Sequence, residues 1–295
     1  MKAFDGLHPA VLLFYFLSVL AVAMFSDNPI LSGAALLGGI LFCAVLQKRS
    51  AVRGNLVFYI PLFLLVAVTN PLFSHSGATP LFSVSGMPIT REALLYGVAL
   101  AATVVGVMLW CNCYSEVMTD DKFLYLFGRV IPKLALVLSM ALRFIPMLKR
   151  RARAVRNAQR GMGLYACGGL AGKIRNTGRI YLAVISWSLE NAMDTAAAMN
   201  ARGYGSGKRT HFSLFRFTER DGAILAVSAL LLGVTVFGMA SGVTAFAYYP
   251  KTDVPNLSPT AVAAYLAFLG LSVCPFIMEM REIAVWKHYN YRSKI

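Results

Sequence analysis

The amino-acid sequence predicts an all-α integral membrane protein with about six transmembrane helices and one basic module between the fourth and fifth of them. Of its 295 residues, 58% are hydrophobic and only 14% are charged, whereas about a quarter of the residues in a soluble globular domain are charged. The mean hydropathy is +0.63. These values exclude an ordinary soluble enzyme and a disordered chain, because long apolar runs are what a bilayer selects.

Six apolar stretches are long enough, at roughly 17 to 25 residues, to cross a hydrocarbon core. They cover residues 9–26, 30–47, 55–74, 90–112, 221–246 and 259–286. The first stretch also has features of a signal peptide, because Lys2 precedes it and Ala21-Val22-Ala23 offers a cleavage site. Asp27-Asn28-Pro29 predicts a tight turn into the second stretch, which favours a retained helical hairpin.

The distribution of basic residues predicts how the spans are oriented. Three Lys or Arg residues lie in the 48–53 loop and three in the C-terminal tail, whereas the 26–29 and 74–89 loops contain none. Short cytoplasmic loops carry an excess of Lys and Arg, so the two basic segments are expected on the cytoplasmic side of a cell membrane. With six spans, both termini then lie on that side. We therefore expect three parts: spans one to four (1–113), a cytoplasmic or interfacial module (114–220), and spans five and six with a basic tail (221–295).

The module at 114–220 holds most of the net charge of +15. It contains 18 of the 28 basic residues but only 6 of the 13 acidic ones. A charge confined to one segment beside the bilayer argues against a nucleic-acid partner and favours contact with anionic lipid headgroups. Each cation near the surface contributes about 1 kcal/mol to the attraction between the segment and the membrane. Within the module, residues 133–160 and 179–202 read as helices, each of which runs into a cluster of glycines.

The first of these helices contains an apolar stretch, 134–148, that is too short to cross the hydrocarbon core as a regular helix. Arg143 lies at its middle and would be costly at the bilayer centre, so we expect the stretch to lie along the interface or against the spans. Pro146 predicts a kink or an interruption of the helix.

Metal binding and nucleotide hydrolysis by this chain are not expected. The five cysteines are scattered, and the Cys-x-Cys at 111 and 113 lacks the spacing of common zinc sites. The run from Gly203 to Thr210 imitates a phosphate loop, but Arg202 stands where its first Gly is needed and Arg209 where Ser or Thr is needed.

The most specific string is Ala201-Arg202-Gly203, at the end of the second helix of the module. One interpretation is structural, because Gly203 is suited to the left-handed residue that ends a helix and Arg202 would then be incidental. The other is functional, because an arginine presents a rigid, always charged fork that can clamp a carboxylate or backbone carbonyls of a partner.

Several strings together resemble one family. They are His8-Pro9 before the first span, Asn70-Pro71-Leu72-Phe73 at the end of the third, Ile89-Thr90 before the fourth, Leu142-Arg143-Phe144-Ile145-Pro146 in the module, and Ala198-Met199 ahead of Ala201-Arg202-Gly203. On these residues nearly the whole chain resembles the transmembrane T component of energy-coupling-factor transporters, which are prokaryotic ABC-type importers of vitamins and metal ions.

The resemblance implies a non-catalytic subunit. Its module would be a pair of coupling helices, with Arg143 and Pro146 as structural parts, docking on two ABC-type ATPase subunits that bind ATP and Mg²⁺. No cofactor is then expected in this chain, and a membrane-embedded S component would bind the substrate. Ala201, Arg202 and Gly203 would form the second of the family's two Ala-Arg-Gly motifs.

The first motif departs from the family pattern. Ala158-Gln159 matches the usual lead-in, but the alignment then places Gly161-Met162-Gly163 where Ala-Arg-Gly is expected. Arg160 lies two residues before Met162, about 200° away around a helix. Two alternatives stay open: Arg160 replaces the missing arginine, or this docking contact is apolar. The mismatch suggests that the two ATPases differ.

Two other functions are alternatives to this one. A permease of a conventional ABC importer would share the docking logic but would use one coupling helix per subunit. A membrane-bound enzyme acting on lipid headgroups would need a carboxylate cluster near the interface, and Asp120-Asp121 is the only adjacent pair of acidic residues in the sequence.

Overall fold

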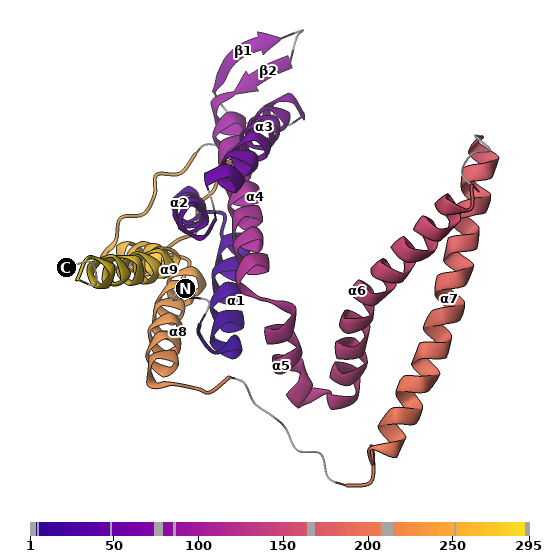
Figure 1. The fold of residues 1–295 in the computed structure, drawn as a ribbon. Coiled ribbons are helices and arrows are strands. Elements are labelled where there is room, and N and C mark those ends of the chain that lie inside the picture. The colour runs from indigo at the N-terminus through magenta and orange to yellow at the C-terminus, as the bar shows by residue number, and fades with distance from the viewer. Residues whose placement is uncertain are drawn as a thin grey trace. The chain divides into compact units, whose positions relative to one another are not determined.

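The computed structural model describes residues 4, 6–47, 49–73, 79–84, 87–163, 169–207, 215–250 and 252–292 (Figure 1). The chain forms two compact units: unit 1 is Met1–Phe123 with Phe215–Ile295, and unit 2 is Leu124–Leu214. Unit 2 therefore begins ten residues after the start of the module expected at 114–220 and ends six residues before its end.

Unit 1 is built from apolar helices, as the fold class predicted. They are α1 (Pro9–Phe25), α2 (Pro29–Leu46), α3 (Arg49–Phe73), α4 (Arg91–Val117), α8 (Glu219–Ala240) and α9 (Pro259–Arg292). Five of these described helices are long and apolar enough to cross a membrane, and α1, with 17 residues, is a shorter apolar helix. The all-helical membrane fold is thus confirmed.

The helix starts are fixed by side chains that satisfy free backbone N–H groups. The side chain of Asn28 accepts a hydrogen bond from the N–H of Ile30 at the start of α2, with Pro29 in the first helical position. Asn28 also donates to the Thr244 carbonyl oxygen and the Tyr265 hydroxyl, which ties this turn to the segment after α8 and to α9. Thr218 and Asp221 form a capping box at the start of α8.

A short hairpin is the one strand feature among the described residues. β1 (Pro80–Val84) and β2 (Met87–Thr90) pair antiparallel, and Figure 1 shows them projecting from the start of α4. From the sequence, this segment was expected to be a loop without basic residues. Thr90 ends β2 and caps α4 by accepting a hydrogen bond from the Ala93 N–H.

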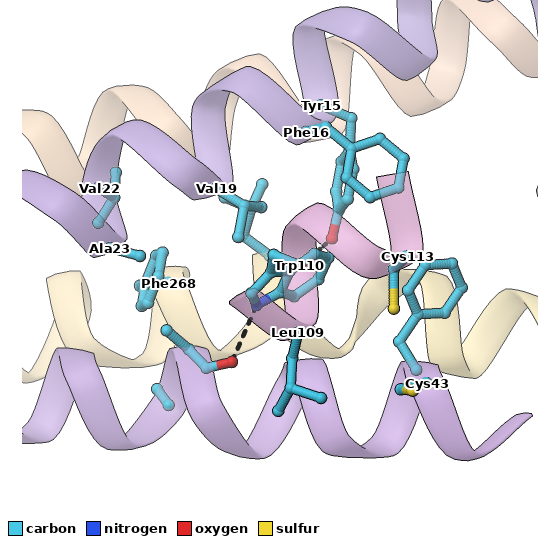
Figure 2. Close-up of a cluster of buried hydrophobic side chains, with 14 of the residues drawn as sticks. Tyr15, Phe16, Val19, Val22, Ala23, Cys43, Leu109, Trp110, Cys113 and Phe268 are labelled. Carbon is cyan, nitrogen blue, oxygen red and sulfur yellow. Dashed lines mark hydrogen bonds between the residues drawn. The ribbon is translucent and has the colours of Figure 1, made fainter. Parts of the chain in front are cut away.

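The core of unit 1 is an aromatic cluster between α1, α2, α4 and α9, shown in Figure 2. Trp110 of α4 is fully buried among Tyr15, Phe16 and Phe42, with ring centroids 6.0 to 6.2 Å apart. Its indole N–H donates to the Ala35 carbonyl oxygen at 2.9 Å. Because lipid tails are as apolar as these side chains, this close packing and the internal hydrogen bond hold the helices together.

Glycines let some of these helices approach closely. A Cβ atom on Gly38 of α2 would lie 2.6 Å from the Cβ atom of Ser272 on α9, whereas one on Gly33 of the same helix would meet nothing within 4 Å. In the sequence, Gly238 and Gly242 suggested a packing face. Gly238 does pack against Ala264 of α9, where an added Cβ would lie 2.6 Å from the Ala264 Cβ.

Gly242 has a different role, because it lies beyond the end of α8 with φ +72°. The fifth span was predicted to run to residue 246, but α8 ends at Ala240. A residue with positive φ interrupts a right-handed helix, and the following turn leads into the loop before α9.

We expect Gly38→Ala to lower the stability of the protein by about 1 to 3 kcal/mol, because the added methyl group forces α2 away from the α9 backbone. Gly33→Ala is the matched control on the same helix and should be neutral or slightly stabilising, since alanine favours helix over glycine. Thermal unfolding in detergent measures both changes. Equal midpoints for the two variants would contradict the close α2–α9 approach.

The second unit contains two long helices, α6 (Pro132–Gly161) and α7 (Leu170–Ala201), preceded by α5 (Asp120–Val130), which begins in unit 1. The helix predicted at 133–160 is confirmed, and Pro146 lies inside it without ending it. The helix predicted at 179–202 begins nine residues earlier. Gly172 and Gly178 lie inside it, because a glycine costs a helix only about 1 kcal/mol and is not a reliable boundary.

Candidate partner-docking helix ends

The C-terminal end of α7 has a regular capping geometry. Arg202 is the C-cap residue (φ −82°, ψ 7°), and Gly203 follows with φ +78°. The Gly203 N–H donates to the Asn200 carbonyl oxygen, and the Tyr204 N–H donates to that of Met199, both at 3.0 Å. This pair of bonds is a Schellman motif, so glycine at 203 is needed for the left-handed conformation.

The arginine itself is not used by the fold. Its side chain is exposed and makes no hydrogen bond or ion pair with the part of the chain that the structure describes. Ala201 and Gly203 beside it are exposed and small. Arg202 therefore lies at the negatively polarised end of a 32-residue helix, with its backbone held by the cap and its guanidinium without a partner among the described residues.

The C-terminal end of α6 repeats this geometry. Met162 is its C-cap residue (φ −79°, ψ 3°), and Gly163 follows with φ +74°. The Gly163 N–H donates to the Arg160 carbonyl oxygen at 3.0 Å, as the Gly203 N–H does to Asn200. Gly161, Met162 and Gly163 thus occupy the same cap positions as Ala201, Arg202 and Gly203.

At this first helix end a methionine stands where the second presents an arginine. The Met162 side chain is 68% exposed, although a large apolar residue is usually buried. Arg160 lies in the last turn of α6 and is also exposed, but its position in the cap is that of Asn200, two residues before Arg202. The structure therefore presents an apolar side chain at the tip, with a cation two residues before it.

Gln159, the lead-in residue of the first motif, is placed inside unit 2. It is 7% exposed, and its Oε1 atom has no hydrogen-bond partner among the described residues. With Asn176 and Ile180 of α7 it makes up the buried side chains of the described part of this unit. The other side chains described there are exposed or half-buried, so Gln159 belongs to the contact between the helices rather than to the presented tip.

Arg143 and Pro146 are not brought near either helix end. Both are exposed near the middle of α6, and Arg143 precedes Gly161 by 18 residues, a rise of about 27 Å. The two helix ends are themselves far apart. Met162 and Gly169 lie at the joined end of α6 and α7, whereas Arg202 lies at the far end of α7, about 48 Å away along the helix (Figure 1).

One contact beyond these ends holds the two helices together. The Arg151 guanidinium of α6 lies 5.6 Å from the centroid of the Trp187 ring on α7, a cation–π contact. From the sequence, Arg151 was expected only to contact anionic lipid headgroups, together with the other cations of the module. A tryptophan on the partner helix was the available signal, but the helix pairing that brings it close is not visible in the sequence.

The carboxylates and cysteines have ordinary structural settings. Asp120 and Asp121 lie exposed in the first turn of α5, where negative charge favours a helix N-terminus. Cys43 and Cys113 are buried in the aromatic core (Figure 2). Within the described ranges, no three His, Cys, Asp or Glu side chains are grouped as metal ligands.

Comparison with known proteins agrees with this architecture. A family model described as CbiQ, cobalt transport protein, matches residues 5–212. The chain is 28% identical over 231 residues to the energy-coupling factor transporter transmembrane protein EcfT of Brevibacillus brevis, covering 74% of this chain and 87% of that protein. It is 36% identical over 115 residues to EcfT of Lactobacillus helveticus, covering 38% of this chain and 42% of that protein.

A third relative carries a different name. Over 172 residues the chain is 30% identical to a putative ABC transporter ATP-binding protein of Bifidobacterium longum, covering 54% of this chain and 22% of that protein. Because the family model spans more than half of its length, this multi-pass membrane protein belongs to the CbiQ family of cobalt transport proteins.

Proposed function

We propose that the chain is the energy-coupling T component of an ECF-type ABC importer, in which unit 2 docks on two ABC-type ATPase subunits. The observation that carries this proposal is the pair of exposed helix ends with the same cap geometry, one presenting Arg202 and the other Met162. Relatives named EcfT, and one named as an ATP-binding protein, support the same assignment.

The helices supply a physical means of transmission. Both α6 and α7 are continuous over 30 or more residues, α6 with Pro146 inside it, and backbone hydrogen bonds couple each turn of a helix to the next. The Arg151–Trp187 contact joins them at the middle of α7, and the buried Asn176 and Ile180 lie nearer the shared end. A displacement imposed on the Arg202 end by an ATPase is therefore passed along α7 to α6.

The two tips imply two unlike docking contacts. At the second tip, the Arg202 fork would bind a carboxylate or backbone carbonyls of one ATPase. At the first, exposed Met162 would enter an apolar groove, with Arg160 close enough to add a charge contact. Unlike tips favour a heterodimeric pair of ATPases over two identical ones.

The remaining assignments follow from the same role. The chain makes no bond itself, ATP and Mg²⁺ are bound by the ATPases, and a membrane-embedded S component binds the vitamin, micronutrient or metal ion. The basic loops favour a cytoplasmic location for unit 2 and both termini in a prokaryotic cell membrane. The charge of unit 2 faces lipid and protein rather than nucleic acid.

Affinity purification of the intact chain from a membrane fraction distinguishes this function from the two rivals. A T component should retain two ABC ATPase chains and one small, separate membrane protein. A conventional permease would pair with a second permease chain and carry no such small subunit. Purified chain that turned over phospholipid without ATPases would support a headgroup enzyme and contradict the proposal.

A further inference from the structure

A cavity of about 330 Å³ opens at the end of unit 1 that carries the β hairpin. Four separate segments meet there: the α1–α2 turn, the end of α3, the start of α4 and the loop after α8, which Figure 1 shows reaching the start of α4. Its walls are Asp27, Asn70, Tyr96, Phe246, Tyr248 and Tyr249.

The aromatic side chains of this cavity pack against one another at steep angles. The Tyr96 and Tyr248 rings are 5.1 Å apart at 70°, and those of Phe246 and Tyr248 are 4.8 Å apart at 70°. Tyrosines at the level of lipid headgroups are ordinary in membrane proteins. Here, however, the rings line one hollow. The face of an aromatic ring carries negative charge density and attracts cations.

The polar groups of the cavity favour the same charge. Asp27 is exposed, and its carboxylate makes no hydrogen bond or ion pair with the described residues. The Tyr248 hydroxyl donates to the Asp27 backbone carbonyl oxygen at 2.9 Å, which fixes the turn against the ring. Burial, with the Asp27 carboxylate nearby, raises the pKa of Tyr248 to about 12, so this phenol stays neutral.

One polar atom in the wall lacks a partner. The Oδ1 atom of Asn70 is buried and accepts no hydrogen bond from any described residue. The surrounding backbone is closely packed, because a Cβ atom on Gly97 would lie 2.6 Å from the Ala67 carbonyl oxygen. A buried amide oxygen left without a donor is costly. Because this oxygen is closed to solvent, a turn of the Asn70 side chain would bring it to an N–H donor in the cavity, which would then satisfy it.

An apolar groove of about 450 Å³ shares Asn70 with this cavity. Its other walls are Leu65, Val66, Thr69 and Phe73 of α3 and Leu100 of α4. Val66 precedes Asn70, and Leu100 follows Tyr96, by four residues, so each pair lies on one helix face. The groove therefore continues from the cavity toward the middle of the spans, where hydrocarbon is the solvent.

We infer that the cavity and groove together bind one phospholipid with a primary ammonium headgroup, such as phosphatidylethanolamine. The ammonium lies among the tyrosine rings, near the Asp27 carboxylate, and donates an N–H to Asn70 Oδ1. An acyl chain occupies the α3–α4 groove. A trimethylammonium headgroup fits the rings but has no N–H for Asn70, so phosphatidylcholine binds more weakly.

Native mass spectrometry of the detergent-purified protein, titrated with phosphatidylethanolamine, phosphatidylcholine or phosphatidylglycerol, tests this inference. Phosphatidylethanolamine should be retained roughly tenfold better than phosphatidylcholine, the difference expected for a charge-assisted hydrogen bond. Equal retention of the three lipids would overturn it. Retention of free ethanolamine without lipid, with the same sensitivity to variants, would place the ligand in solution and would also overturn it.

Variants locate the binding within the cavity. Tyr96→Leu and Asp27→Asn should each weaken phosphatidylethanolamine retention by roughly three- to tenfold, whereas Tyr96→Phe, which keeps the ring, should retain it. Phe58→Leu, at an exposed aromatic of α3 outside the cavity, is the matched control. Asp27 is exposed, so its variant should fold normally, and an unchanged thermal midpoint verifies this. Full retention by both Tyr96→Leu and Asp27→Asn contradicts the site.

Discussion

Arg202→Glu should abolish ATP-dependent uptake by the assembled transporter while leaving the chain in the membrane. The substitution replaces an exposed cation that has no partner among the described residues, so the Schellman cap and the fold should persist. At the interface it places a carboxylate where the proposed partner offers acceptors. Reversal of a central interface arginine costs about 3 kcal/mol or more, so docking should weaken roughly a hundredfold.

Two further variants make this result specific. Arg179→Glu reverses an exposed charge on the same helix, 23 residues before Arg202, and should leave both uptake and ATPase retention close to wild type. Arg202→Lys keeps the charge but loses the planar fork, so an intermediate loss is expected. Uptake and retention of ATPase subunits in pull-downs should fall together. Undiminished uptake by Arg202→Glu would refute its role as the transmission contact.

Trp110→Ala should cause the largest loss of stability among single substitutions in unit 1. It empties a site that is fully buried between Tyr15, Phe16 and Phe42, and it leaves the Ala35 carbonyl oxygen without its indole donor. Truncation of a buried tryptophan costs about 3 to 5 kcal/mol. Thermal unfolding in detergent should show a much lower midpoint and less folded protein after purification.

The comparison with two other variants separates packing from hydrogen bonding. Trp110→Phe keeps a ring in the cluster and loses the donor, so its cost should be smaller, at about 1 to 3 kcal/mol. Trp286→Ala removes a tryptophan that is 49% exposed on α9 and should change the midpoint little. Similar midpoints for Trp110→Ala and Trp286→Ala would show that the aromatic cluster does not hold α4 in place.

The sequence alone determined the membrane fold and most helix positions, because hydropathy over some 20 residues is a local property that a bilayer reads directly. It also singled out the strings at the ends of the module helices, and their role in docking stays a prediction. Predictions from the sequence were wrong where one residue type, here glycine, is compatible with more than one local structure. Gly172 read as part of the glycine cluster before the second module helix, but α7 includes it, and Gly242 looked like part of a packing face although it lies in the turn after α8. In each case a glycine signal is compatible with two backbone conformations.

Only the tertiary structure decided what is presented and what is buried. The sequence could align Met162 with Arg202, but the matching cap geometry depends on two helices ending at the same position relative to a left-handed glycine. Gln159 reads as part of the same motif, yet pairing of α6 with α7 buries it. The tyrosine cavity joins Asp27 to Tyr248, 221 residues apart, and no local pattern specifies such a meeting. A membrane span depends on the hydropathy of one short segment, whereas a site depends on packing between segments that lie far apart in the sequence.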